Sequence, residues 1–228
     1  MQSKVKITKR QIKEDRFTTF MLTTKDQVTA NWQFIVVGAV IVVLTVVAIV
    51  YYINSRAARK EEAGRLFAQA MVDYRSGDRQ VAILSLAQII EDYGGDQVAE
   101  EATYLAGKLN YIDRNYPEAT RYYEMYLSKY RKNLLYRAAS IAGIASCLEN
   151  QGEYAAAAGR FLEAAEEYPS GPLEGDYQLA AMRNYLEIGD IESAKERLDY
   201  IQDELDGTEW SSLSLRLFHE KGRIKSGT

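Results

Sequence analysis

Side chains able to carry out covalent or metal chemistry are scarce in this 228-residue chain. It has one histidine, His219, and one cysteine, Cys147. A nucleophile with its general base, or a closed zinc site, needs several such groups together. The sequence therefore predicts that the protein is not an enzyme and has no catalytic residues, metal site or cofactor.

Carboxylates are more numerous, but their arrangement does not suit catalysis. Adjacent acidic pairs recur at Glu61/Glu62, Glu91/Asp92, Glu100/Glu101 and Glu166/Glu167. Neighbouring residues on a helix point in different directions, so these pairs predict solvated helix faces rather than a two-carboxylate site. The Gly107-Lys108 pair lacks the upstream glycine of a phosphate-binding loop. These residues therefore predict no catalytic or nucleotide site.

A block of uncharged residues, Phe34–Ile53, interrupts the charged sequence. At about 1.5 Å per residue it forms a helix roughly 30 Å long, which matches the hydrocarbon core of a bilayer. Trp32 on one side and Tyr51 and Tyr52 on the other suit the two membrane–water interfaces. The alternative, a buried core helix, rarely runs this long without a polar face. We therefore expect residues 32–53 to form one transmembrane helix.

The position of this block argues against a cleaved signal peptide. About 30 residues precede it, and it is longer than the apolar stretch of about 7–15 residues in secretory signals. A lipid anchor is also disfavoured, because Cys147 lies far downstream of the block. An uncleaved membrane anchor is the expectation.

Charge indicates the orientation of this anchor. Seven basic and three acidic residues precede it, a net charge of +4, whereas the remainder has 21 basic and 29 acidic residues, a net charge of −8. Positive flanks stay in the cytoplasm, which predicts a cytoplasmic N-terminus and an exported body. Basic residues also follow the block closely, so the flanking charges alone do not decide the topology: Arg56, Arg59, Lys60 and Arg65. The acidic body disfavours nucleic-acid binding, because it repels phosphates.

Residues 1–31 form a basic head. Thr8 and Gln11 have the spacing of a capping box, which predicts a helix start. Apolar residues that follow fall roughly on one side of that helix: Ile12, Phe17, Phe20 and Met21. The head is either an amphipathic helix on an anionic leaflet or a partner, or a loosely ordered basic tail that only sets topology.

The body at residues 63–207 repeats itself, after a juxtamembrane linker or helix extension at 54–62. Each unit has an apolar-periodic helix, a polar turn and a second helix that opens on a small residue. The opening residues are spaced by 37, 38 and 37 positions: Ala82, Ala119, Ala157 and Ala194. The tyrosines that end the second helices keep the same spacing: Tyr93, Tyr130 and Tyr168. Such a period predicts a helical solenoid.

This pattern resembles the tetratricopeptide repeat, in which an alanine opens the second helix and an aromatic residue follows four positions later. Ala119 is followed in this way by Tyr123, and Ala157 by Phe161. The resemblance implies an all-α fold with one N-terminal transmembrane helix and a right-handed solenoid of about four repeats. A capping helix and tail are expected at 208–228, where Leu213, Leu217 and Phe218 have helical spacing.

Close packing explains the small residues within the repeats. The tight position of the first helices is filled by Ala70, Gly107 and Ala145, but by Met182 in the fourth repeat. A small side chain lets two helices approach, and the aromatic residue of the next helix fills the space between repeats. Because one unit cannot bury its apolar face alone, the repeats must stack.

The resemblance also implies a concave face, lined by the first helices, that takes a peptide or an unfolded segment. Six residues are the candidates for this groove: Phe67, Met71, Tyr74, Tyr104, Lys108 and Tyr111. Methionine and tyrosine suit promiscuous capture of apolar segments, because one repacks and the other offers area at low entropic cost. The alternative is that several of the six simply pack against neighbouring repeats.

The whole layout resembles the ancillary subunit of the bacterial Sec translocon, whose repeat domain is shared with cell-division coordinator proteins. This resemblance implies a single-pass inner-membrane protein with its repeat domain in the periplasm. It also implies a chaperone-like role, with translocon subunits, periplasmic chaperones or exported clients as partners. Two alternatives stay open: a scaffold for an envelope or cell-division assembly, and a regulator of a membrane enzyme acting through its span. The sequence leaves the oligomeric state unknown.

Overall fold

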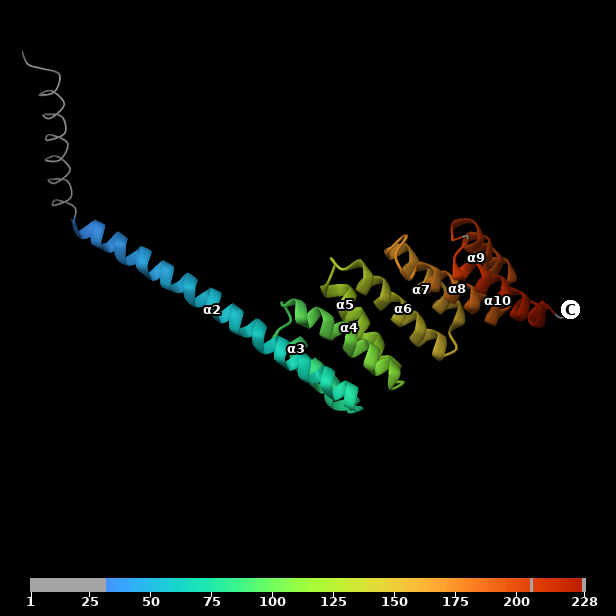
Figure 1. Ribbon diagram of the computed structural model, residues 1–228, viewed down its shortest axis with the longest axis horizontal. Coiled ribbons are helices and arrows are strands. Elements are labelled where there is room, and N and C mark those ends of the chain that lie inside the picture. The colour runs from blue at the N-terminus through green and yellow to red at the C-terminus, as the bar shows by residue number, and fades with distance from the viewer. Residues whose placement is uncertain (1–31, 206, 227–228) are drawn as a thin grey trace, which may run out of the picture. The chain divides into compact units, whose positions relative to one another are not determined.

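The computed structural model describes residues 32–205 and 207–226 (Figure 1). The helix predicted in the basic head at 1–31 lies outside the described residues. Within the described ranges the regular structure is helical throughout, and no strand is present. The expectation of an all-α repeat fold is therefore confirmed for this part of the chain.

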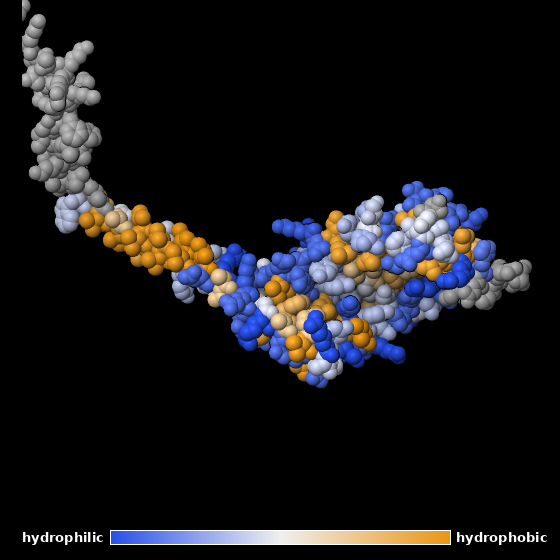
Figure 2. Space-filling model, in the orientation of Figure 1, coloured by the Kyte–Doolittle hydropathy of each residue, from blue (hydrophilic) through white to orange (hydrophobic). Residues whose placement is uncertain are grey.

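The chain divides into two compact units, residues 1–58 and 59–228. Helix α2 (Trp32–Ser76) contains the apolar block and continues through residues 54–62, which are therefore helical. By length and composition α2 is able to cross a membrane, and none of its apolar window is buried. The block stands out as hydrophobic surface in Figure 2.

The three residues predicted at the membrane interface all belong to α2. Trp32, Tyr51 and Tyr52 are each more than half exposed, so the protein itself does not cover them. Their exposure shows only that the rings are available to another surface, and their place at a membrane–water interface stays a prediction.

Eight further helices follow in the described part of the second unit. They are α3 (Arg79–Asp92), α4 (Gln97–Ile112), α5 (Tyr116–Lys129), α6 (Leu134–Asn150), α7 (Tyr154–Glu167), α8 (Glu174–Ile188), α9 (Ile191–Glu204) and α10 (Glu209–Ser226). From α3 onward each helix packs against the next, and α4 also packs on α6 and α8 on α10 (Figure 1). This order is that of paired helices stacked into a solenoid.

Left-handed backbone ends the first helix of each repeat. Gly77, Gly152 and Gly189 have φ values of 96°, 83° and 76°, which favour glycine because it lacks a Cβ atom. Arg114, with φ of 60°, takes the corresponding place in the second repeat. The glycine-containing turns of the sequence are thus helix stops that reverse the chain into the second helix.

The core runs along the solenoid as linked clusters of small and aromatic side chains. The four alanines that open the second helices are fully buried: Ala82, Ala119, Ala157 and Ala194. Cys147 is 1% exposed, and burial raises the pKa of its thiol. This agrees with a packed cysteine rather than a reactive one.

Two glycines hold the ring of Tyr123 between first helices. A Cβ atom added to Gly107 of α4 would lie 2.8 Å from a ring carbon, and one added to Gly143 of α6 would lie 2.4 Å from another. Tyr123 itself is 3% exposed. In the next repeat Phe161, 5% exposed, belongs to the same core cluster as Ala145 and Ala157. The residues predicted for repeat packing are therefore all buried.

Helix α10 covers the end of the fourth repeat. Leu217 and Phe218 pack against the cluster that contains Met182 and Ala194. Trp210 lies so close to α8 that a Cβ atom on Gly175 would fall 2.3 Å from its ring. The terminal repeat therefore does not leave this apolar face bare.

Candidate functional site

A groove of about 440 Å³ lies between the first helices α4, α6 and α8. We call it the α4/α6/α8 groove and define it by its lining residues: Tyr104, Lys108, Tyr111, Tyr123, Ala139, Ala142, Gly143, Ser146, Phe161, Leu173, Asp176, Tyr177, Leu179, Ala180 and Arg183. Its size is that of a site for a small ligand or a few residues of a peptide.

The floor of the groove is formed by small residues of α6. They recur at the spacing that places side chains on one face of a helix: Ala139, Ala142, Gly143 and Ser146. Larger side chains from α4 and α8 form the two walls, including Tyr104, Tyr111 and Tyr177. The groove is open because its central helix presents no large side chain to it.

Contacts between α4 and α6 set the direction of the groove. The rings of Tyr104 and Tyr136 stack with centroids 4.9 Å apart at one end. At the other end the Asn150 side-chain amide donates to the Tyr111 hydroxyl at 3.0 Å. The two helices therefore run in the same direction.

Tyr104 belongs both to the groove and to a cluster of tyrosine rings. Its centroid lies 6.1 Å from that of Tyr123 and 6.4 Å from that of Tyr126. Burial raises the pKa of Tyr104, with a smaller contribution from Tyr136. This side chain thus stays neutral at physiological pH and contributes packing as well as groove surface.

Two of the described lining residues, Tyr177 and Lys108, have a polar group without a partner. Tyr177 is 8% exposed, and its buried hydroxyl has no hydrogen-bond partner. Burial is the main cause of its raised pKa, so the hydroxyl keeps its proton. Within the described ranges the exposed Lys108 ammonium also has no hydrogen bond or ion pair. Lys108 is therefore an exposed donor on the wall formed by α4, whereas the Tyr177 hydroxyl is closed off from solvent.

The other charged residues of the groove already have partners in the chain. Arg183 donates twice to the Glu149 carboxylate, at 2.9 Å in each case. Asp176 accepts from the Trp210 indole N–H at 3.2 Å. These pairs fix the wall formed by α8. Among the described lining residues Lys108 has no partner, and the exposed Asp176 carboxylate, which is bonded to a neutral indole, keeps its negative charge.

The six predicted groove residues separate into two groups. Tyr104, Lys108 and Tyr111 all line the α4/α6/α8 groove. Phe67, Met71 and Tyr74 do not line it; Phe67 and Tyr74 pack instead against the core of the first repeat, with Ala82 and Leu86. That the second-repeat residues bind a ligand stays a prediction.

Two of the acidic pairs are not simply solvated, which corrects the interpretation from sequence. Glu100 accepts a hydrogen bond from the Tyr126 hydroxyl at 2.6 Å, and thereby links α4 to α5. Glu167 of α7 forms an ion pair with Arg137 of α6. The residue types alone did not show that a partner on the next helix lies within reach.

Tyr177 and the floor of α6 are among the groove residues that the sequence did not single out. The small residues of α6 are visible as a stripe at helical spacing, which is the signal that was available. The burial of Tyr177 depends on α6, α7 and α8 together, since its neighbours in the core include Ala142 and Phe161. No local sequence pattern indicates this burial of Tyr177.

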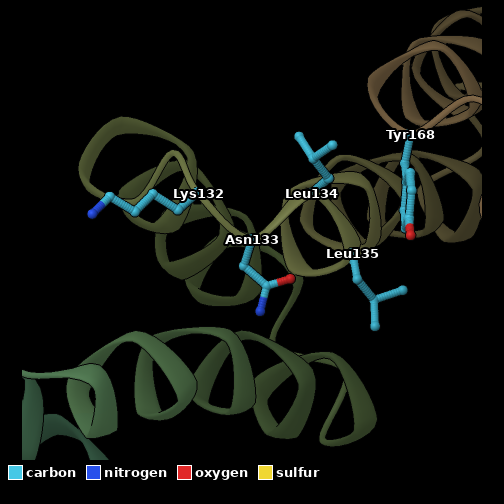
Figure 3. A pocket seen from close by; sticks show the side chains of 5 residues that line it. All are labelled: Lys132, Asn133, Leu134, Leu135 and Tyr168. Atoms are coloured by element: carbon cyan, nitrogen blue, oxygen red, sulfur yellow. The ribbon is translucent and has the colours of Figure 1, made fainter.

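A second cavity of about 470 Å³ lies at the start of α6 (Figure 3). Its lining residues are Lys132, Asn133, Leu134, Leu135 and Tyr168. Lys132 points away from the other four in Figure 3, and the side chains do not converge on one point. Asn133 caps α6, because its side-chain oxygen accepts from the Tyr136 backbone N–H at 3.3 Å. This cavity therefore offers no convergent polar set, and the α4/α6/α8 groove is the better candidate.

In the part of the chain that the structure describes, no group of three or more His, Cys, Asp or Glu residues could hold a metal ion.

Comparisons with known proteins agree with this architecture. The family model described as tetratricopeptide repeat-like domain matches residues 25–169. A tetratricopeptide repeat protein from Parabacteroides merdae ATCC 43184 superposes with a TM-score of 0.59 at 17% identity, over 72% of this chain. The match spans 60% of that protein, so this chain corresponds to only part of its length.

Two crystal structures of nearly identical TPR-like repeats from Podosopora anserina give TM-scores of 0.56 and 0.55 at 15% identity. Each covers 72% of this chain, and 85% and 86% of the respective repeat proteins. At these identities the likeness shows the fold alone. No curated protein matches the sequence.

Proposed function

Because the chain belongs to the tetratricopeptide repeat-like domain family, we propose that it binds segments of other proteins in the α4/α6/α8 groove. One observation carries this proposal: Tyr104, Lys108 and Tyr111 of α4 line an open groove whose floor is made of small residues. A concave, largely apolar site with a few polar groups is the usual form of a binding site.

The proposal includes a membrane anchor. Residues 32–53 of α2 cross the bilayer, the basic head lies in the cytoplasm, and the solenoid lies in the periplasm of a bacterial cell. The exposed apolar window of α2 and the excess of basic residues in the head support this arrangement. The protein then assists newly translocated or envelope proteins near the Sec channel, as the resemblance of its layout implies.

Photo-crosslinking in living cells tests this function. A photoreactive amino acid replaces the exposed Lys108 in the groove, Thr45 in the apolar block, or, as a control outside the groove, Arg160. Many exported proteins captured from position 108 and translocon subunits captured from position 45 support the proposal. Equal capture from positions 108 and 160 contradicts a role for the groove.

A scaffold role is the second candidate, and exposed apolar side chains of the first repeat favour it. Val72, Val81 and Leu84 are 56%, 51% and 70% exposed. Val81 and Leu84 lie three residues apart on α3, and neighbouring exposed apolar residues are typical of protein contact surfaces. If the protein is a scaffold, we expect a photoreactive group at position 84 to capture one recurrent protein. That protein is also expected to copurify in fixed stoichiometry in mild detergent. A diverse set of exported proteins at position 108, with none at position 84, contradicts the scaffold.

A further inference from the structure

We infer that residues 129–135, where α5 ends and α6 begins, form a docking surface for the anionic lipid headgroups of the membrane. We call this segment the basic connection. The inference rests on the proposed function, because it requires the anchor in α2, and it gives the repeat domain a lipid contact of its own. Three features of the segment support it: its charges, its exposed leucines and its place near the anchor along the chain.

The basic connection carries cations that lack acidic partners. Lys129, Arg131 and Lys132 are all exposed. In the part of the chain that the structure describes, none of the three has a hydrogen bond or an ion pair. No acidic residue occurs between Glu124 and Glu149, so the neighbouring sequence supplies no counter-charge. Such a cluster of free cations attracts an anionic surface.

The corresponding connections of the other repeats have the opposite charge. Residues 92–96, 166–174 and 203–209 contain two, three and four acidic residues respectively, and no basic one. An anionic surface repels these three connections and attracts the basic connection. Contact with lipid is therefore expected at one place on the solenoid, although its overall charge is negative.

Exposed leucines adjoin the cations. Leu134 and Leu135 begin α6 and are 44% and 38% exposed. Figure 3 shows that the side chains of Lys132, Leu134 and Leu135 diverge from one another. A divergent set does not enclose a small ligand, but it suits a layer of many headgroups. Basic residues beside exposed apolar ones are typical of segments that lie in the membrane interface, where the apolar side chains enter the headgroup–acyl boundary.

Hydrogen bonds place the basic connection at the same edge of the solenoid as Arg59. The Arg59 guanidinium donates to the Asp92 backbone carbonyl at 2.9 Å, where α3 ends. Two residues further on, the Gly94 backbone carbonyl accepts from the Tyr130 hydroxyl at 3.4 Å. Arg59 is exposed, and its charge offsets part of the acidic charge of residues 92–96.

The anchor keeps this edge near the bilayer. Six residues of chain lead from Ile53, the end of the apolar block, to Arg59. Even fully extended, they span only about 20 Å. A tether this short makes docking an intramolecular step with a high effective concentration of lipid. A few cations and leucines are therefore sufficient for a contact that would be weak without the anchor.

Fluorescence of the full-length protein in lipid nanodiscs tests the inference. Cys147→Ala removes the native thiol, and an environment-sensitive dye is attached to Leu134→Cys. The nanodiscs contain phosphatidylcholine alone or an equal mixture with phosphatidylglycerol. We expect the emission to shift to the blue, and to be quenched by headgroup nitroxides, in the mixed nanodiscs only. The same dye on Gln151→Cys, exposed at the other end of α6, is the control and should not respond.

Charge variants measure the contribution of the cations. Each of Lys129→Gln, Arg131→Gln and Lys132→Gln is expected to lower the ratio of docked to undocked protein about fivefold, and the triple variant on the order of 100-fold. The control removes the same charge from other exposed positions, and its ratio should not change: Arg75→Gln, Lys195→Gln and Arg216→Gln. Equal ratios in the two triple variants overturn the inference. Melting temperatures of both triple variants show whether the fold is intact.

Each other outcome also decides. Equal blue shifts in neutral and mixed nanodiscs overturn the recognition of anionic headgroups. A response on native membrane vesicles but in neither nanodisc assigns the surface to a membrane protein and overturns lipid docking. Protein that does not coelute with nanodiscs in size-exclusion chromatography overturns the proposed anchor itself. Protein that coelutes but shows no response at position 134 overturns the docking alone.

Discussion

Single small residues set how closely the helices of the solenoid approach. Ala119 and Ala157 are fully buried where the second helices begin, and Gly107 and Gly143 lie against different edges of the Tyr123 ring. Protein interiors are packed as densely as organic crystals, so an added methyl group changes the free energy of unfolding. The identity of these residues therefore has measurable consequences for stability.

Ala157→Trp is expected to destabilise the solenoid by about 1–3 kcal/mol or more, because the indole does not fit between packed helices. The neighbouring Ala156 is exposed on the same helix, so Ala156→Trp is the matched control and should cost far less. Urea unfolding followed by circular dichroism measures both. Equal midpoints for the two variants would refute the repeat register.

Two helical glycines should respond to alanine in opposite directions. At Gly143 the new Cβ atom meets the Tyr123 ring at 2.4 Å, whereas at Gly159 of α7 it meets nothing within 4 Å. Gly143→Ala is expected to lower stability by about 1–3 kcal/mol through overpacking. Gly159→Ala is expected to raise it by about 1 kcal/mol through helix propensity. Thermal melts that rank the two variants the other way would contradict the packing described for Tyr123.

At the scale of elements, polar links between helices supplement the apolar core. The Arg137 guanidinium pairs with Glu167 of α7 and also donates to the backbone carbonyls of Leu127 and Tyr130, at 3.2 and 3.1 Å. One side chain of α6 thereby contacts both the helix before it and the helix after it. Because Arg137 and Glu167 are mostly buried, this pair is screened less than a surface pair.

The start of α9 depends on the charge of Asp190. Its carboxylate accepts from the Ser193 backbone N–H at 3.1 Å and from the Ser193 hydroxyl at 2.7 Å. The backbone hydrogen bond is the main cause of the lowered pKa of Asp190. Since the folded pKa lies below the unfolded one, this stabilisation is complete above the unfolded value, about 3.9, and is lost as pH falls through the folded value.

Asp190→Asn is therefore expected to be less stable than the wild type at pH 7, and the difference should shrink on acidification toward pH 3. Asn keeps an acceptor but carries no charge to interact with the helix N-terminus. Hydrogen exchange of the α9 amides, measured across this range, is the test. Asp199→Asn, an exposed position on the same helix, shows how much of the effect comes from net charge alone. A difference that grows below pH 4 would contradict the sign of the pKa shift.

At the scale of the whole molecule, the first unit and the solenoid present different surfaces. The apolar window of α2 is unburied, whereas the solenoid buries most of its large apolar residues and exposes only scattered ones. A long exposed apolar helix is costly in water, because each buried CH₂ group would gain about 0.8 kcal/mol. This contrast is the physical argument for membrane association.

Val43→Arg combined with Val47→Arg is expected to release the protein from the membrane, because each arginine at the centre of a span costs about 2.5–3.5 kcal/mol in insertion. The same two changes at Val72 and Val81, which are exposed on the first repeat, form the control and should leave it membrane-bound. Sodium carbonate extraction followed by immunoblotting distinguishes the outcomes. Wild-type protein found in the soluble fraction would argue against the anchor.

Much of the fold follows from residue pattern alone. The 37- to 38-residue period, with alanines at Ala82, Ala119, Ala157 and Ala194, predicts helix pairs, and each of these residues lies in α3, α5, α7 or α9. The pattern is reliable because each repeat contacts mainly its neighbours, so local spacing determines packing. The all-α class, the stacked repeats and the apolar length of α2 were thus determined by the sequence itself.

Only the tertiary structure decided where the repeats leave an open groove. Tyr104, Lys108 and Tyr111 share it with Tyr177, 66 residues beyond Tyr111, whereas Phe67 and Tyr74 pack into the first-repeat core. It also decided that Glu100 and Glu167 have partners on neighbouring helices. The physical reason is distance along the chain: periodicity specifies which face of a helix is buried, but the space between three stacked helices and the partners of their polar atoms depend on side chains from separate repeats.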